Sequence, residues 1–111
     1  GLKEELPIPI IYPFDFIDGA GAIVLLPGDD RDMPEKTDLR VWAAEYMAGY
    51  SEFWNMPGCE WLRDVLPKIR EGVTSLTAQK TAAYVCARIA ANIAVGREIK
   101  HFPRFYLCKN L

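Results

Sequence analysis

The chain has 111 residues with 13 basic and 15 acidic side chains, and 50% of its residues are apolar while 25% are charged. This composition is typical of an ordinary soluble globular domain and excludes collagen-like, low-complexity and wholly disordered proteins. A chain of this length builds one hydrophobic core, so we expect a single domain over residues 1–111.

Membrane and export signals are not evident in the sequence. The longest apolar stretch, residues 82–95, is interrupted by Arg88 and is shorter than the roughly 18 residues that span a bilayer. The N-terminus shows no basic segment followed by an apolar run, so we predict no signal peptide. Three widely spaced cysteines, Cys59, Cys86 and Cys108, favour reduced thiols and a cytoplasmic location.

Charge is distributed unevenly along the chain. Residues 1–59 hold 11 acidic and 4 basic side chains, whereas residues 60–111 hold 4 acidic and 9 basic ones. This asymmetry predicts either separate acidic and basic faces or an ordinary solvated surface on which the two halves interleave. The basic residues form no run of the kind that marks a nucleic-acid patch.

The first part of the chain is predicted to be extended. Prolines at positions 7, 9 and 13 exclude a helix and cannot donate to a sheet, so residues 1–14 are an extended arm or an edge strand. Residues 18–21 (Asp-Gly-Ala-Gly) have the composition of a turn, and the apolar run at residues 22–26 predicts a buried strand.

The middle of the chain is predicted to form about three helices. The first begins at Thr37 or Asp38, and its apolar residues recur at steps of three and four on one face: Leu39, Trp42, Ala43, Tyr46, Tyr50, Phe53 and Trp54. The second covers residues 61–69 and is expected to be short or kinked because of Pro67.

The third helix is predicted to begin at Ser75 or Thr77 and to end near Arg97 or Glu98. Its buried stripe is expected to be Ala78, Ala82, Val85, Cys86, Ile89 and Ile93. Alanines elsewhere make it slim, so it is either the central helix of the core or, over residues 77–98, the surface of a homo-oligomer. A final strand is predicted at residues 104–108. The fold class is therefore α+β, with short strands near both termini packed against about three helices.

Signatures of catalysis are weak. The glycines at positions 19 and 21 are too few for a phosphate loop and precede a strand. The cysteines and His101 contain no close pair of the kind that zinc sites use. We therefore expect no catalytic residue, no metal site and no cofactor, although enzymatic activity stays an open question.

The segment between the predicted strand and the first helix is strongly acidic. Asp29, Asp30, Asp32 and Glu35 follow the buried strand directly, a position where metal-binding acids often occur. Their spacing does not match a calcium loop. A solvated loop is one interpretation, and a small metal-assisted enzyme that uses residues 29–35, with His101, is an alternative function.

Aromatic residues are unusually dense between positions 46 and 61. Core packing explains such a cluster, but tryptophan and tyrosine are also favoured at interfaces, so part of it could bind a partner. We select Tyr46, Tyr50, Glu52, Phe53 and Trp54 as the candidate partner-binding residues.

The same stretch resembles a known family, the antirestriction proteins of conjugative plasmids of the ArdB/KlcA type. The similar segment is Tyr46-Met47-Ala48-Gly49-Tyr50-Ser51-Glu52-Phe53-Trp54, followed by the turn Asn55-Met56-Pro57-Gly58. Residues 74–92 are similar to the family's Ser/Thr-capped, alanine-containing helix. The chain departs from the family pattern at residues 59–62, where a Gly-Gly-rich strand is usual.

This resemblance implies a small non-enzymatic protein that relieves type I restriction through protein contacts. The nearly neutral chain agrees with that mode of action, because a DNA mimic needs dense negative charge. The sequence therefore predicts a binding or inhibitory protein, with a restriction–modification or other defence complex as the expected partner. The alternatives are the metal-assisted enzyme and an oligomerising structural subunit.

Overall fold

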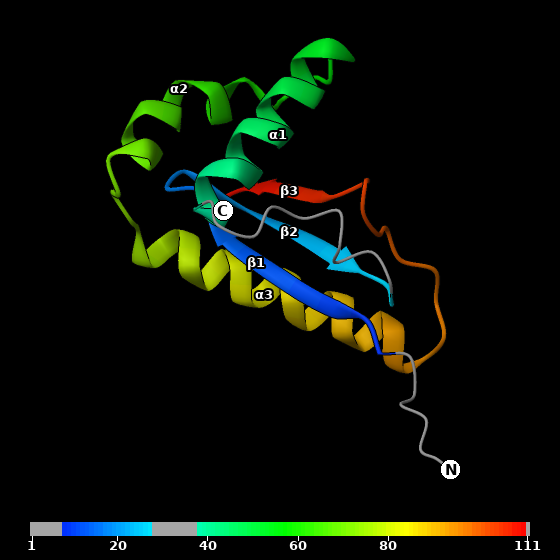
Figure 1. Cartoon of the computed structure of the whole chain (residues 1–111). Coiled ribbons are helices and arrows are strands. Elements are labelled where there is room, and N and C mark those ends of the chain that lie inside the picture. Colours follow the sequence, from blue (N-terminus) through cyan, green and yellow to red (C-terminus); the bar gives the residue numbers. More distant parts are fainter. Residues whose placement is uncertain (1–7, 28–37, 111) are drawn as a thin grey trace.

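The computed structural model describes residues 8–27 and 38–110 and confirms the predicted α+β fold class. Within these residues, the strands β1 (Ile10–Asp15), β2 (Gly19–Leu25) and β3 (Tyr106–Lys109) form an antiparallel sheet in the order β1-β2-β3. Three helices separate β2 from β3: α1 (Leu39–Phe53), α2 (Glu60–Arg70) and α3 (Leu76–Ala94). As Figure 1 shows, α3 lies on one face of the sheet while α1 and α2 lie on the other.

The central strand β2 is buried along its whole length because both of its faces are covered. Ile23 and Leu25 point to the side of α1 and α2, where they join the larger core cluster with Met47 and Leu62. Ala22 and Val24 point to the other side, in a smaller cluster with Ile89 of α3. A strand that is apolar on both faces therefore positions the two helical layers.

The edge strand β1 matches the prediction for the described part of residues 1–14. Ile10 pairs with Leu25 and Asp15 pairs with Ala20, so Pro13 lies in a strand with only one neighbour. Because an edge strand leaves half of its N–H groups unpaired within the sheet, it can accommodate proline. Residues 1–7 lie outside the described residues, as do Thr37 and the acidic loop at residues 29–35.

The predicted turn at residues 18–21 is wrong. Gly19, Ala20 and Gly21 belong to β2, and the chain reverses at residues 16–18, where Ile17 has a φ of 67°. The glycines serve close packing: a Cβ atom on Gly19 would lie 2.4 Å from the Trp61 ring, and one on Gly21 would lie 2.6 Å from the Phe16 ring. Glycine is common in turns, but at these two positions its lack of a side chain lets neighbouring side chains approach the backbone.

The helix α1 begins at Asp38, one of the two predicted caps, whose carboxylate accepts hydrogen bonds from the N–H groups of Arg40 and Val41. It ends where Asn55 adopts a φ of 51°. There the N–H of Met56 donates to the carbonyl of Ser51, and the N–H of Asn55 donates to that of Glu52. This left-handed cap satisfies carbonyls at the end of the helix.

The helix α2 buries one face and runs through Pro67 for three more residues, to Arg70. Its 11 residues make it shorter than α1 and α3, as its proline suggested. The buried residues are Trp61, Leu62, Val65, Leu66 and Ile69. Gly72 closes the helix with a φ of 88°.

The helix α3 begins at Ser75, which resolves the two predicted caps, because the Ser75 hydroxyl accepts a hydrogen bond from the N–H of Ala78. The predicted end near Arg97 or Glu98 is wrong. The helix ends at Ala94, since Gly96 has a φ of 77° and the N–H of Arg97 donates back to the carbonyl of Asn92. Of the predicted buried stripe, Ala78, Ala82 and Ile89 are buried, whereas three residues are only half-buried: Val85, Cys86 and Ile93.

The predicted role of α3 as the central helix of the core is also wrong. It packs on one face of the sheet, and the larger core cluster lies on the opposite face. Its outer side stays exposed, with Leu76 at 72% and Tyr84 at 55% of their full accessible surface. No contact within the described residues covers that side, so use of α3 in a homo-oligomer stays a prediction.

Asp15 at the end of β1 joins three elements. Its carboxylate accepts hydrogen bonds from the N–H of Ser75 at 2.8 Å, the amide of Gln79 at 3.0 Å and the N–H of Ile17 at 2.9 Å. The Arg40 guanidinium lies 3.8 Å from it. Burial alone would raise the pKa of Asp15, but these hydrogen bonds and the positive charge together lower it. A charged Asp15 therefore fixes the starts of α1 and α3 against the sheet.

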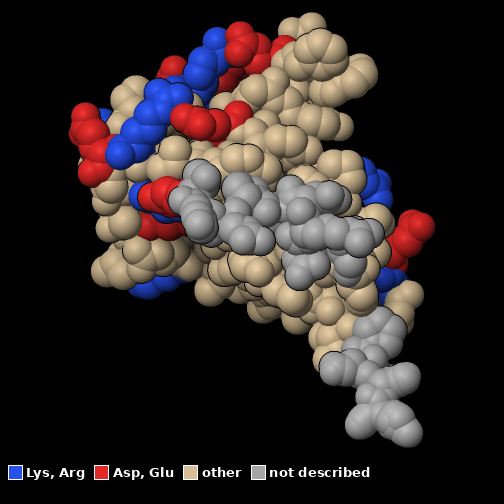
Figure 2. Space-filling view, viewed as in Figure 1, with Lys and Arg blue, Asp and Glu red and all other residues tan. Residues whose placement is uncertain are grey.

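Charges from the two halves of the sequence interleave on the surface of α1 and α2. Arg63 pairs with Glu52 at 3.1 Å and Arg70 pairs with Glu45 at 2.9 Å, and each pair joins a base of the second half to an acid of the first. Figure 2 shows blue and red side chains mixed over these helices. In the described residues, this face follows the interleaved alternative rather than separation into an acidic and a basic face.

Candidate protein-binding site

The aromatic row of α1 lies beside its buried stripe. Ala43, Ala44, Met47 and Ser51 are buried against the sheet and α2. Trp42, Tyr46 and Tyr50 follow one another at steps of four and are half-buried at the edge of the core. The Trp42 and Tyr46 rings stack with centroids 5.3 Å apart. The row continues past the end of the helix, because the Tyr50 ring contacts the Trp54 ring at 6.4 Å.

Tyr46, the first predicted binding residue, connects α1 to the segment before β3. Its hydroxyl donates a hydrogen bond to the carbonyl of Pro103 at 2.7 Å. Its ring meets Phe102 at 5.9 Å and the edge of Phe105 at 5.9 Å. Burial raises the pKa of Tyr46, and the neighbouring Tyr50 adds to that rise. Tyr46 therefore stays a neutral hydrogen-bond donor that fastens two segments, so its main role is structural.

Phe53 and Trp54 are exposed, although they were predicted on the same helical face as Ala43. Phe53 retains 75% and Trp54 61% of its full accessible surface. The helix extends past the sheet at this end, so nothing in the described residues covers them (Figure 1). Their rings meet edge to face with centroids 5.0 Å apart. Two large adjacent aromatic side chains are thus presented to solvent.

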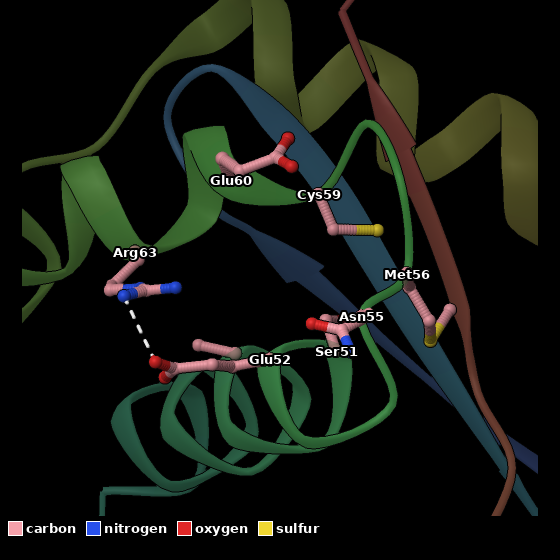
Figure 3. A pocket seen from close by; sticks show the side chains of 8 residues that line it. Ser51, Glu52, Asn55, Met56, Cys59, Glu60 and Arg63 are labelled. Carbon is pink, nitrogen blue, oxygen red and sulfur yellow. Dashed lines mark ion pairs between the residues drawn. The ribbon is translucent and has the colours of Figure 1, made fainter.

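Glu52 lies on the neighbouring side of α1, where it faces α2. Its side chain is 59% exposed and forms the ion pair with Arg63. In Figure 3 the two side chains reach toward each other between the helices. The structure thus brings Glu52, Phe53 and Trp54 to one end of α1, but the charged residue and the two aromatic residues have different surroundings. Glu52 is engaged in an ion pair, whereas Phe53 and Trp54 leave most of their ring surface exposed to solvent.

A small polar pocket lies in the corner between α1 and α2. Its volume is about 150 Å³, and its lining residues are Ala48, Ser51, Glu52, Asn55, Met56, Cys59, Glu60 and Arg63. The Ser51 hydroxyl donates to the carbonyl of Met47 at 2.7 Å, so its proton is already engaged. No histidine lines the pocket, and the Cys59 thiol lies 3.9 Å from the carbonyl oxygen of Pro57. Within the described residues, Ser51 and Cys59 thus donate to backbone carbonyls and not to a side chain that could serve as the base in covalent catalysis.

An apolar groove lies on the other side of Met56, which lines both hollows. Its volume is about 240 Å³, and it is lined by Tyr50, Trp54, Met56, Lys100, Arg104 and Phe105. The contribution of residues 100–105 to this groove was not predicted, because they lie about 50 positions away from α1 in the sequence. The available signals were the basic excess of the second half and the turn at His101-Phe102-Pro103. Neither indicated that these residues meet the aromatic row.

The other sequence candidates do not form a site in the described residues. The Nδ1 atom of His101 lies 3.2 Å from the carbonyl oxygen of Phe102, and the ring is half-buried. The three cysteines are unpaired, and burial raises the pKa of Cys86. No group of three or more potential metal ligands occurs in residues 8–27 and 38–110. Within the same ranges, no helix has the length and apolar character required to cross a membrane.

Comparison with known proteins identifies no relative: no family model matches the chain, and neither a curated protein nor a solved structure shows significant similarity. The resemblance to antirestriction proteins therefore stays a prediction. What can be argued about function comes from the geometry at the end of α1.

Proposed function

We propose that this chain is a small protein-binding protein that attaches to its partner through the end of α1. The observation that carries the proposal is the exposure of Phe53 and Trp54, 75% and 61%, side by side on a defined helix end. Large aromatic side chains dominate binding energy at protein interfaces. Leaving two of them in water has no benefit for folding, so a surface that covers them is the physical expectation.

The rigidity of the helix end supports the same proposal. The N–H of Trp54 donates to the carbonyl of Tyr50, and the hydrogen bonds of Asn55 and Met56 back to α1 fix the chain directly after Trp54. The Trp54 ring also rests against Tyr50, which meets the buried Phe105 at 5.2 Å. A preformed aromatic surface loses less conformational entropy on binding than a flexible one.

Inhibition of a restriction–modification complex is the most specific form of this proposal. The resemblance to antirestriction proteins spans about residues 46–92, and its first block, residues 46–54, carries the exposed aromatic pair. The three ion pairs of the described residues and the mixed charges on α1 and α2 suit contact with a protein better than imitation of DNA.

The test compares the wild-type domain with the double variant Phe53→Ala/Trp54→Ala as baits for bacterial lysate, with mass spectrometry of the retained proteins. Leu76→Ala is the matched control, because Leu76 is 72% exposed but lies on α3. We expect a partner that the wild type and the control retain and the double variant loses, while all three keep the same melting temperature. Equal retention by the double variant would refute the proposal.

The antirestriction form has its own test in cells that carry a type I restriction system. Expression of the wild-type domain should raise the plating efficiency of unmodified phage, whereas Phe53→Ala/Trp54→Ala should not. No effect of the wild type, together with a partner captured from lysate, would remove antirestriction and keep protein binding.

A further inference from the structure

We propose that the groove beside Trp54 receives an apolar side chain from an acidic segment of the partner protein, and that Lys100 and Arg104 bind carboxylates on either side of it. This inference rests on the proposed protein-binding function and specifies the chemistry of the partner.

The size of the groove suits one side chain. Its volume of about 240 Å³ lies below the roughly 300–1,000 Å³ that is usual for small-molecule and cofactor sites. Tyr50, Trp54 and Phe105 supply aromatic walls, and Met56 supplies a flexible thioether that adapts to different apolar shapes. An anchor residue of a peptide fits this description better than a cofactor does.

The two cations at the groove lack acidic partners in the described part of the chain. Every ion pair there engages Arg40, Arg63 or Arg70, and none engages Lys100 or Arg104. The Lys100 ammonium lies 5.3 Å above the Tyr106 ring, a contact that holds the side chain without giving it a carboxylate partner among the described residues. Two exposed positive charges beside an apolar groove are complementary to carboxylates that flank an apolar residue.

The groove is preformed by contacts between distant segments. The hydrogen bond from Tyr46 to Pro103 attaches residues 100–105 to α1, and Phe105 is buried to 7% exposure against the aromatic row. The N–H of Phe102 donates to the carbonyl of Val24 at 2.8 Å, which ties the same segment to β2. The backbone that carries Lys100 and Arg104 is therefore fixed relative to the aromatic walls before a partner arrives.

The charges around the groove favour a protein over a nucleic acid. Single-stranded nucleic acid also stacks on aromatic rings, but it requires a positively charged path that follows several phosphates. Here the groove offers two cations, and the pocket on the other side of Met56 holds Glu52, Glu60 and Arg63, with Arg63 already paired to Glu52. That pocket therefore does not continue the positive charge that a phosphate backbone would follow, whereas a short acidic peptide needs only the two cations of the groove.

The test is a titration of the isotope-labelled domain, followed by NMR, with three designed nine-residue peptides. The first has a central phenylalanine flanked by glutamates, the second has lysines in place of the glutamates, and the third has glycine in place of the phenylalanine. We expect only the first to shift the Trp54 indole and the Arg104 amide in a saturable manner. Binding should weaken at least about tenfold in Lys100→Glu/Arg104→Glu, the loss expected for two charge-assisted contacts.

Lys80→Glu is the matched charge control, because Lys80 is exposed on α3 and does not line the groove. It should bind the first peptide like the wild type. Equal binding of the lysine peptide, no shift at the groove, or preferential binding of a single-stranded oligonucleotide would each overturn the inference.

A parallel pull-down separates this inference from the proposed function. If Lys100→Glu/Arg104→Glu retains the partner that Phe53→Ala/Trp54→Ala loses, protein binding stands and the acidic-segment inference fails. If both double variants retain the partner, the proposed protein-binding function and the acidic-segment inference both fail. If both double variants lose the partner while their melting temperatures stay unchanged, the result supports the proposed function and the inference.

Discussion

Two glycines in this chain differ in the space that surrounds them. Gly21 lies in the buried strand β2, where a Cβ atom would come within 2.6 Å of the Phe16 ring and 3.0 Å of the Met47 sulfur. Gly49 lies inside α1, where a Cβ atom would meet nothing within 4 Å. The first glycine is required by packing, whereas the second only weakens its helix.

We predict that Gly21→Ala lowers the free energy of unfolding by about 1–3 kcal/mol, because the added methyl group overpacks the core. Gly49→Ala should raise it by about 0.5–1 kcal/mol, because alanine favours the helix. Urea denaturation of the two variants measures both changes. A stable Gly21→Ala variant would contradict the close packing of β2 against Phe16 and Met47.

The helices are delimited by local hydrogen bonds at their ends. Asn55, Gly72 and Gly96 each take a positive φ directly after a helix, and the next N–H donates back to a carbonyl of the last turn. Such caps stop a helix at a defined residue. The cap of α1 places Trp54 at the exposed end of that helix. The cap of α3 ends the helix at Ala94, so that the chain continues as the segment that leads to residues 100–105.

The start of α3 gives a prediction at this scale. Ser75→Ala removes the acceptor for the N–H of Ala78 and should cost about 1 kcal/mol of stability. Thr77→Ala is the control: Thr77 is exposed inside the first turn, so its replacement should change stability by less than about 0.5 kcal/mol. Chemical denaturation measures both, and a larger loss for Thr77→Ala would move the cap to that residue.

At the scale of the whole molecule, the connection between α3 and β3 is held to α1 by a single side-chain hydrogen bond together with ring contacts. The Tyr46 hydroxyl makes that bond to Pro103, across 57 positions of sequence. The neighbouring Tyr50 ring packs on Phe105, but its hydroxyl has no partner in the described residues. Removing the hydroxyl group of each tyrosine in turn therefore distinguishes the contribution of the hydrogen bond from that of the ring contacts.

We predict that Tyr46→Phe costs about 0.5–1.5 kcal/mol of stability, the usual net value of one hydrogen bond. It should also speed hydrogen exchange of the Phe102 and Arg104 amides, because the segment loses its attachment to α1. Tyr50→Phe should change neither quantity measurably. Exchange measured by NMR gives the answer, and equal effects of the two variants would show that the hydroxyl of Tyr46 is not the attachment.

Much of the fold could be predicted from sequence because it depends on local patterns. Prolines at positions 7, 9 and 13 indicated an extended arm or an edge strand, and apolar repeats located the three helices. The side chains of Thr37 and Asp38 gave two candidate caps for α1, of which the structure uses Asp38. The errors at Gly19–Gly21 and at Gly96 are opposite ones. Gly19 and Gly21 were expected in a turn but make room for neighbours in space, such as the Trp61 ring, whereas Gly96 takes a positive φ and ends α3 inside the stretch predicted to be helical.

The sequence by itself determined the α+β class, the order of the elements and the aromatic density of α1, because each depends on residues within a few positions of one another. Only the tertiary structure decided which aromatic residues are covered. Tyr46 is half-buried because residues 102–105 fold against it, whereas Phe53 and Trp54 extend beyond the sheet. The groove with Lys100 and Arg104 likewise forms only when residues 50–56 and 100–105 come together in the fold. Positive charges and apolar side chains that are distant in sequence can bind the same partner only once the fold places them side by side.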